Sequence, residues 1–334
     1  MKRESNLDLL RVFCCIAVIL EHACGAFINE AKTMGGGYLC IVATLSYFAI
    51  PCFLMLTGAF ADKRIENVSA FYKNSLIKLG VPTLIFSILY SVWYILLAVK
   101  GGNISAGLQN VAKYWKTGWL GHPLWYMYML VGLYAIIPIV QKAIVEIKMN
   151  ILTISIVFCL WAAISSYTSS STVTYSLDRV VMLLSYVIMG YAIKNTFSYK
   201  NIKIAFILII LGILLLNLNG LFVYYCLQNN LNWRAWGNNF SPFVMLGSIL
   251  IFAGFCKIEY KHEVKLAKYT FIIYLFHEGV LEVVRYAAGK VLPLERSMHL
   301  VIAVIVLEVL VVFCVSLILS VLYSKTQKLI ARKV

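Results

Sequence analysis

Long apolar runs alternate with short polar segments along nearly the whole chain. A helix needs about 20 apolar residues to cross the hydrocarbon core of a bilayer, and ten runs approach or exceed that length. The pattern therefore predicts an all-α, polytopic integral membrane protein with a single transmembrane domain over residues 1–334. The predicted spans cover residues 7–28, 37–60, 76–99, 123–141, 149–166, 178–193, 202–225, 241–256, 267–287 and 299–323.

The first run follows Met1-Lys-Arg and resembles a signal peptide in its charge and hydropathy. Glu21 and His22 come directly after its apolar stretch, where a cleavage site would require small residues. We therefore predict an uncleaved first span.

Lys and Arg are distributed unequally between the two sets of loops that ten spans create. With the N-terminus inside, 19 of the 29 Lys and Arg lie on the inner side and 8 on the outer side, while Arg11 and Arg179 fall within spans. Because cytoplasmic loops are enriched in Lys and Arg, the asymmetry predicts that both termini are cytoplasmic.

Composition excludes the soluble classes. Hydrophobic residues make up 62% of the chain and charged residues 13%, with a mean hydropathy of +0.86, whereas soluble domains average about 25% charged residues. In a soluble protein the net charge of +15 would indicate nucleic acid; here it reflects loop topology, and no nucleic-acid partner is expected. The nine cysteines form no Cys-x-x-Cys pair, and no two histidines share ligand spacing on one helix, so we predict neither a disulfide framework nor a metal site.

The first span carries ionisable residues that are costly inside a bilayer. Asp8 precedes Arg11 by three residues, a spacing that brings helical side chains together. Eleven residues separate Arg11 from His22, so both lie on one helix face, roughly 16 Å apart along the axis. Arg11 is expected near the cytoplasmic surface and His22 at or beyond mid-membrane. Glu21 points about 100° away, toward a different neighbour.

The ninth and tenth spans carry a second polar group. Glu278, Glu282 and Arg285 are spaced four and three residues apart, so they form one helical stripe. His277 points elsewhere, and Glu308 lies near the middle of the tenth span. Glu21, Glu278 and Glu308 are also consistent with structural polar packing between helices.

Two further groups flank the membrane. His122 and Trp125 open the fourth span from outside, where aromatic residues anchor helices in the interface and a histidine could contact an extracytoplasmic substrate. Lys73 and Lys78 begin the third span from inside. They fit the positive-inside rule, and they equally fit a site for a phosphorylated ligand arriving from the cytoplasm.

Together these pieces, in this order, resemble the integral-membrane acyltransferase family 3, and the resemblance covers nearly the whole chain. The matching elements are Leu7-Asp8-Leu9-Leu10-Arg11 with His22, Pro51 to Thr57-Gly58, Phe71-x-Lys73-x4-Lys78-x3-Pro82, His122-Pro-Leu-Trp125-Tyr126, Met189-Gly190-Tyr191 and Tyr274-Leu-Phe-His277. Lys73 and Lys78 stand where many members carry arginines, and Thr57 stands where they carry serine. No appended soluble domain follows the tenth span, so we expect a stand-alone form.

The resemblance implies an enzyme that transfers an acyl group, acetyl being the most frequent, from cytoplasmic acyl-coenzyme A to a hydroxyl. The implied acceptors are cell-surface glycans, lipid-linked sugars and related molecules, and the implied location is the bacterial cytoplasmic membrane. Arg11, Lys73 and Lys78 would hold the donor, His22 with Arg11 would perform the chemistry, and His122, Trp125 and His277 would contact the acceptor. His22 would act as general base, and a covalent acyl-histidine intermediate stays open.

Two other classes fit parts of the sequence. A proton-coupled transporter or flippase would use the same intramembrane histidines and glutamates as a relay, although no internal repeat is visible. A membrane sensor or scaffold would use the polar stripe to hold a partner helix. The sequence does not specify the acceptor, the acyl group or the oligomeric state.

Overall fold

A computed structural model describes residues 4–25, 37–60, 65, 67–117, 124–146, 151–168, 177–197, 199–291 and 298–331. These ranges are mostly helical, and they contain no strand. The helices are α1 (Ser5–Gly25), α2 (Gly37–Leu45), α3 (Ala49–Ala59), α4 (Val68–Ser75), α5 (Val81–Lys100), α6 (Ile104–Thr117), α7 (Leu124–Glu146), α8 (Ile151–Thr168), α9 (Leu177–Thr196), α10 (Ile202–Gln228), α11 (Pro242–Lys257), α12 (Thr270–Val291) and α13 (Met298–Ala331). A 3₁₀ turn (Ser46–Phe48) joins α2 to α3, and a π-helical turn (Leu76–Gly80) joins α4 to α5.

Each of the ten predicted spans coincides with a helix or a continuous pair of helices. Within the described residues, five are long and apolar enough to cross a membrane: Gly37–Ala59, Val68–Lys100, Leu124–Lys142, Ile202–Gln228 and Leu300–Gln327. Helices α1 and α12 each carry at least three acidic or basic residues, which lowers the hydropathy of both helices. The protein is thus an all-helical membrane protein. The count of ten spans and the cytoplasmic termini stay predictions.

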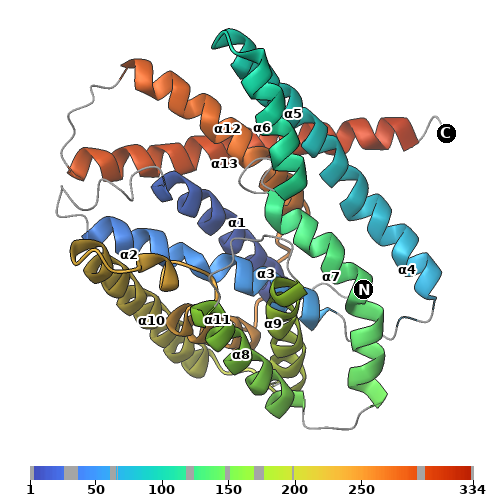
Figure 1. The fold of residues 1–334 in the computed structure, drawn as a ribbon. Helices are drawn as coiled ribbons and strands as arrows, with labels where there is room; N and C mark the ends of the chain where they lie inside the picture. The colour runs from blue at the N-terminus through green and yellow to red at the C-terminus, as the bar shows by residue number, and fades with distance from the viewer. Residues whose placement is uncertain are drawn as a thin grey trace.

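Helix α1 lies at the centre of the bundle (Figure 1). It packs against α2, α3 and α11 on one side and against α12 and α13 on the other. Its buried residues include Leu7, Leu10, Cys14 and Val18, which contribute to the main core. A central helix that bears charged residues places those residues inside the protein, away from lipid.

Helices α3 and α9 approach each other through two glycines. A Cβ atom on Gly58 would lie 1.8 Å from the carbonyl oxygen of Val187, and one on Gly190 would lie 2.0 Å from that of Met55. Only a residue without a side chain permits this backbone contact. Both glycines belong to the motifs that carry the family resemblance, and their role is to set the distance between two helices.

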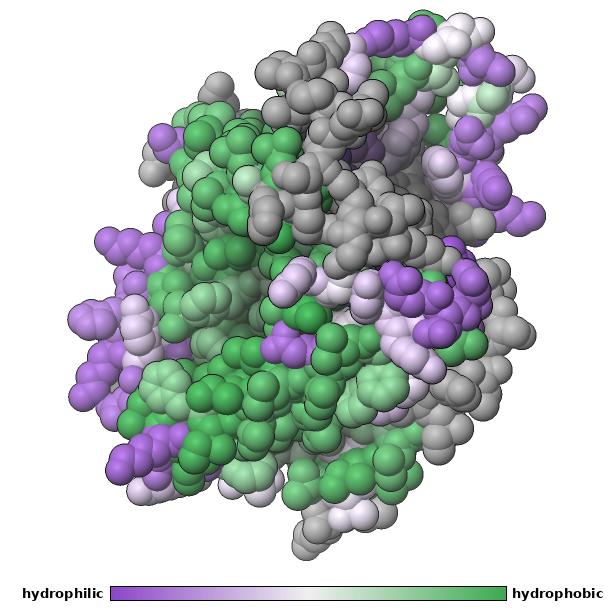
Figure 2. Space-filling view, turned by 90° about the vertical axis from the view of Figure 1, so that its left-hand side faces the viewer, coloured by the Kyte–Doolittle hydropathy of each residue, from purple (hydrophilic) through white to green (hydrophobic). Residues whose placement is uncertain are grey.

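The outer surface is apolar over a broad face, with hydrophilic side chains gathered toward its edges (Figure 2). Helix α10 exposes Phe206, Ile207 and Ile210, and α13 exposes Leu307 and Leu310. Water would penalise such surfaces, whereas lipid tails solvate them. The exposed faces of these helices are therefore the surfaces that fit a bilayer.

Among the described residues, two α-helices lie outside the predicted spans: α4, which extends the third span at its N-terminal end, and α6. Helix α6 occupies part of the expected loop between the third and fourth spans. Asn103 caps it, since its side-chain oxygen accepts a hydrogen bond from the backbone N–H of Ala106 at 3.0 Å. Its sequence contains Lys113, Lys116 and several polar residues, so its mean hydropathy is too low for a predicted span.

Candidate active site

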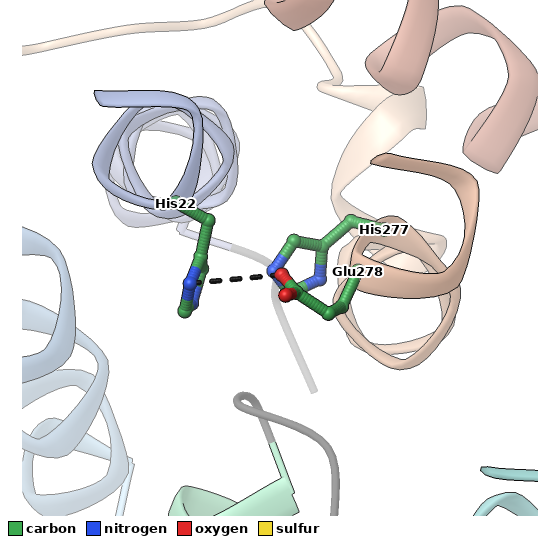
Figure 3. A group of neighbouring side chains, drawn as sticks. All are labelled: His22, His277 and Glu278. Atoms are coloured by element: carbon green, nitrogen blue, oxygen red, sulfur yellow. Dashed lines mark ion pairs between the residues drawn. The ribbon is translucent and has the colours of Figure 1, made fainter. Parts of the chain in front are cut away.

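Three side chains from α1 and α12 converge in the interior (Figure 3). Nδ1 of His22 lies 3.6 Å from Oε2 of Glu278, and the ring centroids of His22 and His277 are 5.2 Å apart. One nitrogen of each imidazole and one carboxylate oxygen of Glu278 all lie within 4.8 Å of one another. We call His22, His277 and Glu278 the histidine cluster. It brings together a possible base, its carboxylate partner and a second imidazole.

The backbone of α12 fixes the orientation of His277. Its Nδ1 lies 2.5 Å from the carbonyl oxygen of Tyr274. A carbonyl only accepts hydrogen bonds, so Nδ1 carries the hydrogen and Nε2 presents its lone pair. Nε2 of His277 and Oε2 of Glu278 are buried, and neither has a hydrogen-bond partner among the described residues. Such atoms are suited to accept a hydrogen bond from a ligand.

Arg285 ties the end of α1 to α12. Its Nη2 donates to the backbone carbonyl oxygens of His22 at 2.6 Å and Ala23 at 3.1 Å. These carbonyls belong to the last turn of α1, where no intrahelical donor remains and a cation is favourable. Nε of Arg285 also lies 3.6 Å from Oε2 of Glu308 in α13. Arg285 thereby holds the backbone that carries His22.

Glu282, the middle residue of the stripe on α12, faces α5. Nε1 of Trp93 donates to Oε2 of Glu282 at 2.6 Å, and the hydroxyl of Tyr94 donates to Oε1 at 3.4 Å. Glu282 is one helical turn beyond Glu278. Glu278, Glu282 and Arg285 therefore connect α12 to α1, α5 and α13, respectively.

A cavity of about 1090 Å³ opens beside the other half of α1. Three cations line it, Arg11 on α1, Lys78 in the π-helical turn and Lys194 on α9. Nη1 of Arg11 lies 2.9 Å from Oδ1 of Asp8, which confirms the pair predicted from their spacing. Nζ of Lys194 lies 2.9 Å from Oε1 of Glu4. The cavity is a cationic site whose charges are partly neutralised by neighbouring carboxylates.

The two cations on α1 and α9 share one aromatic neighbour. The guanidinium of Arg11 lies 5.4 Å from the ring centroid of Phe60, and Nζ of Lys194 lies 5.3 Å from it. Nζ of Lys194 also donates to the carbonyl oxygen of Ala59 at 2.9 Å. The C-terminal end of α3 thus positions both charges at the cavity wall.

Tyr126 on α7 and Tyr274 on α12 both line the cavity, and Tyr274 precedes His277 by three residues along α12. Their rings meet edge to face with centroids 5.6 Å apart, and both side chains are buried. The ring of Tyr274 lies 5.3 Å from that of His277. We call Tyr126 and Tyr274 the tyrosine pair; both line the cavity, and Tyr274 also borders the histidine cluster.

The predicted site residues fall into three groups. Arg11 and Lys78 line the cavity, and His22, His277 and Glu278 form the cluster. Lys73 is exposed on α4 and is not among the cavity-lining residues, while Trp125 packs edge to face against Tyr126. His122 lies outside the described residues. Glu21 is half-buried on α1, and Glu308 neighbours Arg285.

Sequence reasoning did not assign a site role to Lys194, Tyr126 or Arg285. Lys194 was counted only as a cytoplasmic lysine, although it follows the Gly190-Tyr191 motif by less than one turn. Tyr126 ends the His-Pro-Leu-Trp-Tyr motif and Arg285 ends the α12 stripe. Each of these residues lies in or next to a sequence motif, but only the fold shows which residues it contacts.

The histidine cluster is also the group that would hold a metal if the protein carried one. Two imidazoles and one carboxylate match the ligand set of zinc sites with an open position. The prediction of no metal considered ligand spacing within one helix, and this group spans two. The absence of a metal stays a prediction.

The fold and the site define a class of helical membrane proteins with a cation-lined cavity and a histidine cluster in the interior. Comparison with protein families narrows this class: the model of an acyltransferase domain, that of acyltransferase family 3, matches residues 4–325. The chain belongs to this family. Neither the search of curated proteins nor that of solved structures finds a match.

Proposed function

We propose that this protein transfers an acyl group, acetyl in the first instance, from acyl-coenzyme A to a hydroxyl of a glycan or lipid-linked sugar of the cell envelope. One observation carries the proposal: Tyr274 lines the cavity that Arg11, Lys78 and Lys194 also line, and its ring lies 5.3 Å from that of His277 in the histidine cluster. A polyanionic donor requires cations that bind its phosphates, and a base-catalysed transfer requires a base near the reactive end of the donor.

The donor binds from the cytoplasmic side. The cavity is lined by the start of α1, the end of α3, the π-helical turn before α5, the end of α9, the start of α12 and a long stretch of α7 from Tyr126 to Gln141. Ten alternating spans with cytoplasmic termini assign the first five of these elements to the inner side, together with the end of α7. Arg11, Lys78 and Lys194 bind the donor's phosphates there, since Lys and Arg are the usual phosphate ligands.

The pantetheine arm of the donor extends from the cations toward the tyrosine pair. The rise along α1 from Arg11 to His22 is roughly 16 Å, and the apolar side chains of Phe53, Leu56 and Leu130 line the intervening cavity. The thioester is thereby delivered next to the histidine cluster, where water is scarce.

His22 acts as the general base. Glu278 holds Nδ1–H of His22, so Nε2 of His22 accepts the proton of the acceptor hydroxyl. The hydroxyl oxygen forms a bond to the thioester carbonyl carbon, and the carbon–sulfur bond breaks. The departing thiolate takes the proton from His22, which leaves an ester and free coenzyme A. His277 positions the acceptor because its unprotonated Nε2 accepts a hydrogen bond from a second hydroxyl of the sugar.

The acceptor arrives from the opposite side. The end of α1, the end of α5 and the later turns of α12 all fall on the outer side of the ten-span topology. A bacterial cytoplasmic membrane supplies both compartments, with acyl-coenzyme A inside and envelope sugars outside. The donor and the acceptor therefore reach the site from opposite sides of the bilayer.

The test is transfer of radiolabelled acetyl from acetyl-coenzyme A into membranes that contain the protein. Membranes with the wild type should incorporate label into a glycan or lipid fraction well above membranes that lack it. The double variant Arg11→Gln/Lys194→Gln should lose most of this incorporation while still inserting into the membrane. Proton-coupled uptake of a solute, without consumption of acetyl-coenzyme A in several glycan-rich host membranes, would contradict the proposal and favour a transporter.

A further inference from the structure

We propose that Tyr126, together with Tyr274, selects the length of the transferred acyl group by limiting the space beside the histidine cluster. This inference rests on the proposed function and extends it to the choice of donor. It assigns a specificity role to Tyr126, a residue of α7 that belongs neither to the cations of the cavity nor to the histidine cluster.

The two tyrosines lie in the lining of the cavity, and one of them borders the histidine cluster. The cavity is lined by Leu130, Met127 and Tyr126 on α7 and by Thr270, Phe271 and Tyr274 on α12. The ring of Tyr274 lies 5.3 Å from that of His277. An acyl group that approaches His277 from the cavity would therefore lie against the ring of Tyr274 and beside that of Tyr126.

The surroundings of the pair leave little room for a longer chain. Tyr126 is 4% exposed and Tyr274 is 5% exposed, and their rings are in edge-to-face contact in the lining of the cavity. On the far side, Leu275 and His277 are fully buried, and the rings of His22 and His277 lie 5.2 Å apart. Packed interiors accommodate added methylene groups poorly. Discrimination of about 10- to 200-fold per methylene is typical of a filled pocket.

Tyr126 is the residue of the pair whose side chain can be tested by itself. Tyr274 also orients His277 through its backbone carbonyl and lies on the same helix as the cluster. Tyr126 instead belongs to α7 and contacts Trp125 and Tyr274 through ring edges. A smaller residue at position 126 enlarges the space near the thioester while leaving the helix with the catalytic groups unchanged.

The experiment compares radiolabelled acetyl-, butyryl- and hexanoyl-coenzyme A as donors to the same membranes. The wild type should prefer acetyl to hexanoyl by at least about 100-fold, and Tyr126→Ala should reduce this ratio at least about tenfold. Tyr126→Phe keeps the ring and should keep the ratio. Leu130→Ala, one turn nearer the cavity mouth on the same helix, is the matched control and should also keep it.

Three outcomes would overturn the inference while leaving the proposed function intact. The wild type could use hexanoyl as well as acetyl, Tyr126→Ala could transfer acetyl with an unchanged ratio, or Leu130→Ala could shift the ratio equally. If Tyr126→Ala fails to fold, as judged by gel filtration in detergent, Tyr126→Leu takes its place with the same expectation. Absence of transfer from every donor by the wild type would instead remove the proposed function.

Discussion

Nδ1 of His22, in the last turn of α1, lies 3.6 Å from Oε2 of Glu278 in α12. This is an ion-pair distance, longer than a hydrogen bond, and such contacts commonly shorten when a substrate binds. The two residues are separated by more than 250 positions in the sequence, and the pairing assigns Glu278 a part in orienting the base.

Glu278→Gln should lower kcat about 100-fold with little change in KM for the donor, because a neutral amide no longer stabilises the imidazolium that forms during transfer. Steady-state kinetics with acetyl-coenzyme A measures the change. Glu282→Gln is the matched control, one turn further along α12 and bonded to Trp93. A loss in Glu282→Gln as large as that in Glu278→Gln would argue against a specific role for Glu278.

Lys194→Gln should raise KM for acyl-coenzyme A about 10-fold and change kcat little, because a cation that binds phosphate acts on the bound donor and not on the reacting atoms. Lys73→Gln removes the same charge from an exposed position that is not among the cavity-lining residues. Its KM should change less than twofold. Equal effects of the two substitutions would indicate general attraction of the donor to a basic surface.

Glu4→Gln should lower KM for the donor, since the carboxylate of Glu4 lies 2.9 Å from Nζ of Lys194 and competes with the donor's phosphates for it. The exposed setting of Glu4 limits the gain to a fewfold. Donor titrations at low and high salt would detect it, and the gain should shrink as salt rises. An unchanged KM at low salt would show that Glu4 does not compete.

Gly58→Ala and Gly190→Ala should each destabilise the fold, because their new methyl groups would meet backbone carbonyl oxygens 1.8 and 2.0 Å away. Overpacking of this kind costs about 1–3 kcal/mol, and more where backbone must move. Thermal unfolding in detergent measures the loss. Gly132→Ala in α7 is the control, since its Cβ would meet nothing within 4 Å, and a comparable loss there would refute the packing explanation.

Chelators should leave acyl transfer unchanged, because the proposed mechanism uses His22 as a base rather than as a ligand. Incubation with 1,10-phenanthroline followed by the transfer assay, together with elemental analysis of the purified protein, provides the measurement. Loss of activity that zinc restores would show that His22, His277 and Glu278 form a metal site and would require a different role for His22.

Helical periodicity predicted relations within single helices. It paired Asp8 with Arg11 and put Arg11 and His22 on one face, and the apolar runs located ten segments that are all helical. It did not predict which helices become neighbours. The meeting of His22 with Glu278 depends on α1 packing against α12, and a single sequence contains no spacing rule for contacts between distant helices.

The same limit explains the cavity residues. Lys78 was marked by its basic cluster, whereas Lys194 looked like one more cytoplasmic lysine until α9 was seen to end beside Phe60. Lys73 and Lys78 were equivalent in the sequence. The π-helical turn over Leu76–Gly80 contains only Lys78, which lines the cavity, and π-turns of this kind are not predictable from hydropathy.

Substitution of His22 tests the central claim most directly. Purified wild type and His22→Ala, reconstituted with membrane acceptor, would be compared for transfer of radiolabelled acetyl, with His262→Ala as the control because His262 is exposed in the segment between α11 and α12. The account predicts that His22→Ala retains at most about 1% of wild-type transfer and unchanged binding of coenzyme A, while His262→Ala is fully active. Full transfer by a correctly folded His22→Ala protein would contradict the account.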